Sequence, residues 1–142
     1  MKKKICLCSS RKFFDRLWPI KEELERLGYD VLLPSMKNFQ DNFLKQKGEE
    51  DARNKIHYDL IRKHFKKIDE SDAIVVCNFE KKGIKGHIGG NSFMEMSKAF
   101  DKGIPIFLLN SIPQVNYRDE IVAMQPIVIS DLCGIKEHME AR

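Results

Sequence analysis

The run of residues 73–78, AIVVCN, constrains the fold of this chain more than any other feature of the sequence. Its first five residues are apolar, and Ile74, Val75 and Val76 are β-branched, which favours a β-strand. The run follows a segment with apolar residues at helical spacing and precedes a loop that leads into another such segment. We therefore expect a central, buried strand here, with a helix before it and a helix after it.

Further strand and helix patterns alternate along the chain. Strands are predicted over residues 4–9, 29–33, 104–110 and 126–130, and helices over residues 13–27, 51–70, 91–102 and 117–124, with a helical tail at 131–142. This alternation predicts an α/β fold with one doubly wound, Rossmann-like sheet of five parallel strands in the order 2-1-3-4-5, and helices on both faces. Pro19 fits the first helix only if regular helix begins just before it or kinks there. Residues 35–50 show no clear period, and we interpret them as a flexible or partly helical segment, a candidate lid.

The composition indicates a soluble globular protein with a single domain over residues 1–142. Hydrophobic residues make up 42% and charged residues 32%, and no apolar run approaches the ~20 residues that a membrane span needs. The N-terminal MKKK precedes only a short strand-like run and not the apolar stretch of a signal peptide, so we expect a cytoplasmic protein. The net charge of +4 is modest and mixed, which argues against a nucleic-acid polymer as partner but is compatible with a small anionic ligand.

The cysteines indicate reduced thiols. Cys6, Cys8 and Cys77 fall within predicted buried strands, and Cys133 stands alone near the C-terminus. This distribution fits a reducing compartment better than a disulfide framework. Because the spacing of Cys6 and Cys8 differs from that of a zinc knuckle, no metal site is expected.

The predicted strand order places the ligand site. In such sheets, ligands bind outside the carboxyl ends of the strands, at the switch point between the first and third strands. This rule brings Ser9, Ser10 and Arg11, which follow the first strand, face to face with residues 81–95. We therefore expect the functional residues in these two segments.

The second of these segments contains a helix start. Gly89 and Gly90 allow close backbone approach, and the unpaired N–H groups that follow can bind an anion such as phosphate. Asn91 or Ser92 is also an ordinary N-cap residue. Glu95 lies within a turn of the helix start, where its carboxylate is either solvated or aimed into the crevice. Its position at the switch point favours the crevice.

Several of these residues together resemble a known family. Residues 71–76 (SDAIVV), the glycines before the next helix, Glu95, Ala99 and residues 102–106 (KGIPI) are similar to the core signature of the nucleoside 2-deoxyribosyltransferase superfamily, which includes deoxynucleoside monophosphate N-glycosidases. The similarity covers the first strand and residues 71–110. It implies that Glu95 attacks the anomeric carbon of a nucleoside or its 5′-monophosphate, and that water or another base resolves the covalent glycosyl-enzyme. It also implies that the protein forms a homodimer or a higher homo-oligomer, and we expect no cofactor.

The resemblance further implies substrate contacts. Family members that act on monophosphates hold the phosphate with groups after the first strand and before the catalytic glutamate; the corresponding residues here are Ser9, Ser10, Arg11, Gly89, Gly90 and Ser92. Arg11 could bind a phosphate bidentately, or it is an ordinary solvated arginine. Asn91 belongs to the same loop, and Asn110 ends the fourth strand at the same edge of the sheet.

One position departs from the family pattern. Relatives have a sugar-binding Asp about eight residues before the Ser-Asp pair that opens the third strand, and His64 stands there. His64 either takes a related hydrogen-bonding role or is a half-buried structural histidine. His87, in the glycine-rich loop, is either a general acid for the departing base or a surface residue. Two alternative functions stay open: a nucleotide-binding sensor without turnover, and a nicotinamide dinucleotide glycohydrolase.

Overall fold

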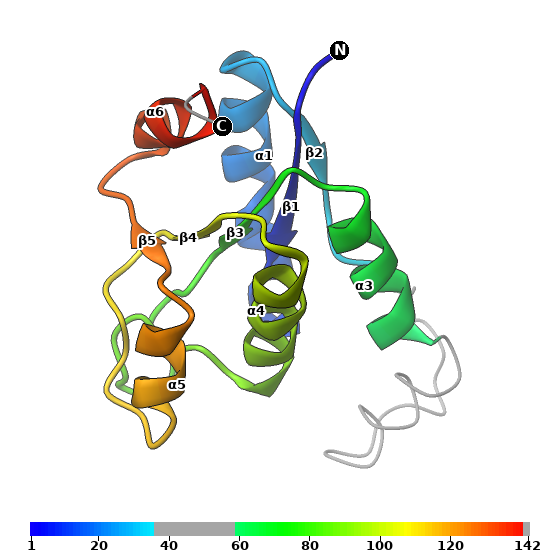
Figure 1. Cartoon of the computed structure of the whole chain (residues 1–142). Coiled ribbons are helices and arrows are strands. Elements are labelled where there is room, and N and C mark those ends of the chain that lie inside the picture. Colours follow the sequence, from blue (N-terminus) through cyan, green and yellow to red (C-terminus); the bar gives the residue numbers. More distant parts are fainter. Residues whose placement is uncertain (36–58, 141–142) are drawn as a thin grey trace.

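The computed structural model describes residues 1–35 and 59–140. Within these ranges the strands are β1 (Lys4–Cys8), β2 (Asp30–Leu32), β3 (Ala73–Val76), β4 (Ile106–Leu108) and β5 (Ile127–Val128), and the helices are α1 (Leu17–Arg26), α3 (Leu60–Asp69), α4 (Gly90–Lys102), α5 (Arg118–Ala123) and α6 (Ile135–Glu140) (Figure 1). The short 3₁₀ helices η1 (Arg11–Arg16) and η3 (Leu132–Gly134) precede α1 and α6. Apart from Ser35, the candidate lid at residues 35–50 lies outside the described residues, as does the first part of the helix predicted over residues 51–70.

The strands form one parallel sheet in the order β2-β1-β3-β4-β5, which confirms the predicted doubly wound α/β fold. Cys8 is paired with Val76, and each is the last residue of its strand. β1 and β3 therefore end side by side. The chain leaves β1 for β2 on one side and returns to β3 on the other, so the switch point opens at the carboxyl ends of β1 and β3.

The side chains of β1 alternate between two hydrophobic cores. Ile5 and Leu7 are fully buried in the core that contains residues of α1 and α6. Cys6 and Cys8 are fully buried in the other core, with residues of α3, α4 and α5. Helices therefore cover both faces of the sheet, as predicted (Figure 1). The alternation also directs both β1 sulfur atoms toward the side of the sheet that α3 and α4 cover.

Several helices and strands are shorter in the structure than the sequence predicts. The helix predicted over residues 13–27 is divided into η1 and α1, and Pro19 lies in the first turn of α1, where a backbone N–H would have no partner within the helix. The fourth strand begins at Ile106 rather than at residue 104, because Pro105 has no N–H to donate to a neighbouring strand. Among the residues that the structure describes, no helix has both the length and the apolar character needed to cross a membrane.

Candidate active site

The start of α4 lies at the carboxyl edge of the sheet and brings Glu95 into place. Gly89, with an extended backbone (φ −86°, ψ −176°), is the N-cap of α4. As a glycine it has no side chain that could cap the helix. The alternative that Asn91 or Ser92 is the N-cap is therefore wrong, since both residues lie inside the first turn. The backbone N–H groups of that turn have no partner within the helix, and such groups can bind an anion. Glu95 follows one turn later on the same helix.

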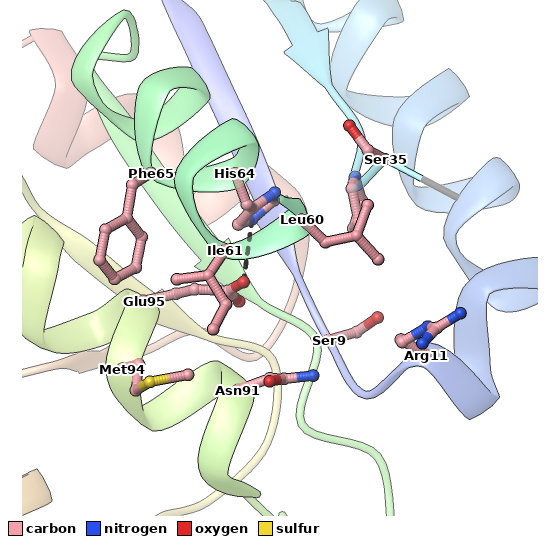
Figure 2. A pocket seen from close by; sticks show the side chains of 11 residues that line it. Ser9, Arg11, Ser35, Leu60, Ile61, His64, Phe65, Asn91, Met94 and Glu95 are labelled. Carbon is pink, nitrogen blue, oxygen red and sulfur yellow. Dashed lines mark ion pairs between the residues drawn. The ribbon is translucent and has the colours of Figure 1, made fainter. Parts of the chain in front are cut away.

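A pocket lies between the carboxyl end of β1 and the helices α3 and α4 (Figure 2). It is lined by Ser9, Arg11, Pro34, Ser35, Leu60, Ile61, His64, Phe65, Asn91, Met94 and Glu95. Among these described lining residues, Glu95 is the only carboxylate. Apolar side chains from both helices line the pocket with Glu95, and Ser9 and Arg11 line it at the end of β1. An apolar pocket with a few convergent polar groups is the usual form of a small-molecule site.

Glu95 is held against His64. The Nε2 atom of His64 lies 3.5 Å from Oε2 of Glu95, and Figure 2 shows the two side chains pointing toward one another from α3 and α4. Their side chains are only 5% and 14% exposed, respectively. The prediction that Glu95 is aimed into the crevice, rather than solvated, agrees with this placement. His64 is buried rather than half-buried, and it contacts the candidate catalytic group.

Two thiols lie near the same nitrogen of the His64 ring. The Sγ atoms of Cys6 and Cys8 lie 3.6 Å and 3.4 Å from His64 Nε2. The cysteines are two residues apart on β1, so they project from the same face of the strand. One ring nitrogen thus faces both sulfur atoms and the Glu95 carboxylate.

The proton affinities of these groups depend on one another. Burial lowers the pKa of His64, but the hydrogen bond with Cys6 and the charge of Glu95 outweigh it, so the net shift is upward. The hydrogen bond from Cys8 lowers the pKa of Cys6 to about 6, against the effect of burial and with support from His64. Burial, together with the hydrogen bond to Cys6, raises the pKa of Cys8 well above its usual range. The shifts favour an imidazolium beside a thiolate, directly against Glu95.

A basic hollow adjoins this pocket. It is lined by Ser10, Arg11, Lys12, Lys81, Gly89, Gly90, Asn91 and Ser92. Arg11 and Asn91 line both the hollow and the pocket, so the two are continuous at these residues. The Lys81 ammonium donates to Ser10 Oγ at 3.2 Å, which ties the loop after β3 to the end of β1. Cationic side chains next to the N-terminus of α4 make this hollow suited to an anion.

The structure therefore places most of the predicted substrate-binding residues in two adjoining spaces, the pocket that contains Glu95 and the basic hollow. The pocket includes Ser9, Arg11, His64 and Asn91, and the hollow includes Ser10, Arg11, Gly89, Gly90, Asn91 and Ser92.

Asn110 does not join either lining. Its backbone N–H donates to Asn78 Oδ1 at 2.9 Å, and its side-chain amide donates to the Asn78 carbonyl at 3.1 Å. Asn110 follows β4, which is separated from β1 by β3, so the strand order itself keeps it away from the pocket. The structure gives Asn110 a role in joining the ends of β3 and β4.

His87 also lies outside both linings, and it is half-buried. Partial burial, followed by the positive charges of Lys81 and Lys82, lowers its pKa. A histidine that resists protonation in this way is a poor proton donor at neutral pH. Of its two predicted roles, this favours a residue of the loop surface over a general acid.

Two groups at the site were not predicted from the sequence. The first group is the apolar lining of the pocket, Leu60, Ile61, Phe65 and Met94, which were not among the predicted site residues. The contact of Cys6 and Cys8 with His64 was not expected at all. The spacing of the cysteines on a strand was visible in the sequence, but nothing in the sequence says that α3 packs against that face.

A solved structure has a fold similar to that of this chain. The chain is similar to the solved structure of a CMP N-glycosidase, BcmB, from Clostridium botulinum, with 17% sequence identity and a TM-score of 0.50. The similarity covers 98% of this chain and 97% of that one. No protein-family model and no curated protein matches the sequence. At this identity the similarity establishes a shared fold.

Proposed function

We propose that this chain cleaves the N-glycosidic bond of a nucleoside or its 5′-monophosphate, with Glu95 as the nucleophile. The observation that carries the proposal is a largely buried carboxylate, 14% exposed, in a pocket at the switch point between β1 and β3. Glutamates are seldom covered to this extent unless they are paired or used in a site. The shared fold with a CMP N-glycosidase and the resemblance around Glu95 support the same chemistry.

The proposed reaction has two displacements at one carbon. An oxygen of Glu95 attacks the anomeric carbon, and the bond from this carbon to the base nitrogen breaks. The electron pair of that bond leaves with the base, which takes up a proton, and the sugar becomes an ester of Glu95. Water or a second base then attacks the same carbon, loses a proton and frees the carboxylate. Two inversions give overall retention of configuration.

His64 fits the role of a positioning residue in this reaction. Its ring is fixed by burial between α3 and β1, and its Nε2 atom faces Glu95 Oε2 at 3.5 Å. A carboxylate fixed in this way needs little reorganisation before it attacks, which lowers the entropic cost of the step. His64 stands where relatives carry an Asp that binds the sugar hydroxyl, so in this chain the position contacts the nucleophile from the side of α3.

The adjoining hollow supports a monophosphate as the preferred substrate class. Arg11 can donate bidentately to a phosphate, while Lys12 and Lys81 add positive charge around it. The backbone N–H groups after Gly89 add further donors at the start of α4. Because Arg11 lines both spaces, a sugar in the pocket would place its 5′-phosphate in the hollow.

A base-release assay tests the proposal and identifies the substrate. Wild type, Glu95→Ala and the control Glu120→Ala, which removes an exposed glutamate of α5, are incubated with ribo- and deoxynucleosides, their 5′-monophosphates and a nicotinamide dinucleotide. Free base is then measured by chromatography. We expect release by wild type and Glu120→Ala but not by Glu95→Ala.

The other outcomes are equally informative. Release by Glu95→Ala at the wild-type rate would refute the role of Glu95. If no form releases base and calorimetry shows that a nucleotide binds, the result would refute the enzymatic function and support a nucleotide-binding sensor. Release from the nicotinamide dinucleotide alone would indicate a glycohydrolase of that class.

A further inference from the structure

Cys6, Cys8 and His64 form a cluster of metal-ligating side chains under the pocket. One ligand atom from each, the two sulfur atoms and a ring nitrogen, all lie within 4.8 Å of one another. All three residues are buried, with exposures of 0%, 0% and 4%. Three groups that favour the same metals thus converge on one point, although the cysteines come from a strand and the histidine from a helix more than fifty residues later.

The distances from the His64 nitrogen to the two sulfur atoms match those of a tetrahedral zinc site. With Zn–S bonds of about 2.3 Å and Zn–N bonds of about 2.0–2.1 Å, tetrahedral geometry separates a sulfur from a nitrogen by roughly 3.6 Å. In this chain His64 Nε2 lies 3.6 Å from Cys6 Sγ and 3.4 Å from Cys8 Sγ. A nitrogen and a carboxylate oxygen on the same ion would be roughly 3.4 Å apart. Glu95 Oε2 lies 3.5 Å from the same nitrogen.

We propose that Cys6, Cys8 and His64 bind a thiophilic divalent cation, Zn²⁺ in the first place, with its fourth coordination position facing Glu95. The ion would lie between β1 and α3, where its three protein ligands are already gathered. The pocket lined by His64 and Glu95 provides its path from solvent.

The chemistry of the ligands selects this class of ion. Two thiolates and one imidazole favour Zn²⁺ and related soft or borderline ions over Mg²⁺ and Ca²⁺, which prefer oxygen. Both cysteines and the His64 ring nitrogen bind the ion in their deprotonated forms, so the protons that these groups carry pass to solvent, and the two thiolate charges balance the charge of the cation. A neutral assembly of this kind suits a buried place in the core. The fourth position then takes a water molecule, which keeps the assembly neutral, or Glu95, whose carboxylate would approach the ion and make the assembly anionic.

Occupancy of this site would also affect Glu95, a consequence that rests on the proposed function. The ion would engage the His64 nitrogen that faces Glu95 and draw the carboxylate toward itself. A carboxylate that binds a cation is a weaker nucleophile, so we expect Zn²⁺ to inhibit base release. Metal binding itself does not depend on that activity.

Cobalt spectroscopy tests the binding directly, on the full chain after treatment with a chelator and a reductant. Co²⁺ serves as the probe because tetrahedral thiolate coordination gives visible d–d bands and a thiolate-to-cobalt charge-transfer band. We expect one Co²⁺ per chain, displaced by one Zn²⁺. Cys8→Ser should weaken binding by about 100-fold or more, since even residues that only support a ligand are worth about 10- to 100-fold. The control Cys133→Ser, at an exposed cysteine, should bind as wild type does.

The outcomes separate this site from the proposed function. Absence of the charge-transfer band in wild type would overturn the site, and so would an unchanged spectrum in Cys8→Ser. If circular dichroism shows that Cys8→Ser does not fold, the test of the metal site rests on the cobalt spectra of wild type and of His64→Gln. The His64→Gln variant keeps both thiols. A protein that binds Co²⁺ as expected but releases no base would keep the metal site and lose the glycosidase proposal. A protein that releases base but does not bind Co²⁺ would support the glycosidase proposal and refute the metal site.

Discussion

His64 Nε2 lies 3.5 Å from Glu95 Oε2, and this contact joins α3 to α4 at the edge of the pocket. The same nitrogen faces the sulfur atoms of Cys6 and Cys8, at 3.6 Å and 3.4 Å. His64 therefore contacts both the candidate nucleophile and β1, one of the two strands that end at the switch point. A change in the protonation or metal binding of Cys6, Cys8 and His64 should therefore act directly on the Glu95 carboxylate.

The stability of the protein should depend on pH through His64. Burial lowers its pKa, but Cys6 and Glu95 raise it beyond the ordinary value of 6.5. A pKa that is higher in the folded state gives stability that is complete below the unfolded-state pKa and is lost as pH rises through the folded-state pKa. We expect the difference in free energy of unfolding between wild type and His64→Gln to shrink as pH rises above about 6.5. Urea denaturation with a chelator, over a pH series, measures this; a difference that grows with pH would contradict it.

Arg11→Ala should weaken the binding of nucleoside monophosphates far more than that of nucleosides. A hydrogen-bonded charge pair is worth about 1.5–3 kcal/mol, which corresponds to roughly 10- to 100-fold in affinity. Isothermal calorimetry on the Glu95→Ala background measures both ligands without turnover. Arg26→Ala, at an exposed arginine of α1, is the control and should change neither affinity. Equal weakening of both ligands by Arg11→Ala would remove Arg11 from the phosphate site.

The loop between β3 and α4 should depend on Gly86. Its φ is +66°, and a Cβ atom there would overlap the backbone carbonyl of Ser111. Gly83, with φ +77°, has open space around it. Gly83→Ala should therefore lower the free energy of unfolding only through the strain of the left-handed backbone, by about 1 kcal/mol. Gly86→Ala adds an overpacking cost of about 1–3 kcal/mol. Thermal or urea denaturation of both variants should find Gly86→Ala the less stable, and equal stabilities would refute this account of the loop.

The four cysteines should differ in reactivity. Cys6, Cys8 and Cys77 are buried, and Cys133 is exposed. Burial also raises the pKa of Cys77 far above its usual range, which keeps it a thiol. Titration of the metal-free native protein with a thiol reagent should label Cys133 quickly and the other three only after denaturation. Rapid labelling of Cys133→Ser would show that the core cysteines are accessible after all.

The sheet and the place of the site could be predicted from the sequence because both depend on local patterns. Continuous apolar runs such as residues 73–77 indicate buried parallel strands, and the strand order then selects the segments around Ser9 and Glu95. The environment of His64 could not be predicted, because it depends on which face of β1 packs against α3. Asn110 was assigned to the site from its place at the sheet edge, and the intervening strand β3 separates it from the pocket.

The most direct test of the central claim compares the rate of base release by Glu95→Gln and by wild type, on the substrate that the panel identifies. Glutamine keeps the size of the side chain and removes the nucleophilic carboxylate, and Glu120→Gln controls for the loss of an exposed charge. We predict a rate more than about 1,000-fold below wild type for Glu95→Gln, the scale of loss when an enzyme loses its nucleophile, with substrate still bound. Glu95→Gln releasing base at a rate within a few-fold of wild type would contradict the account.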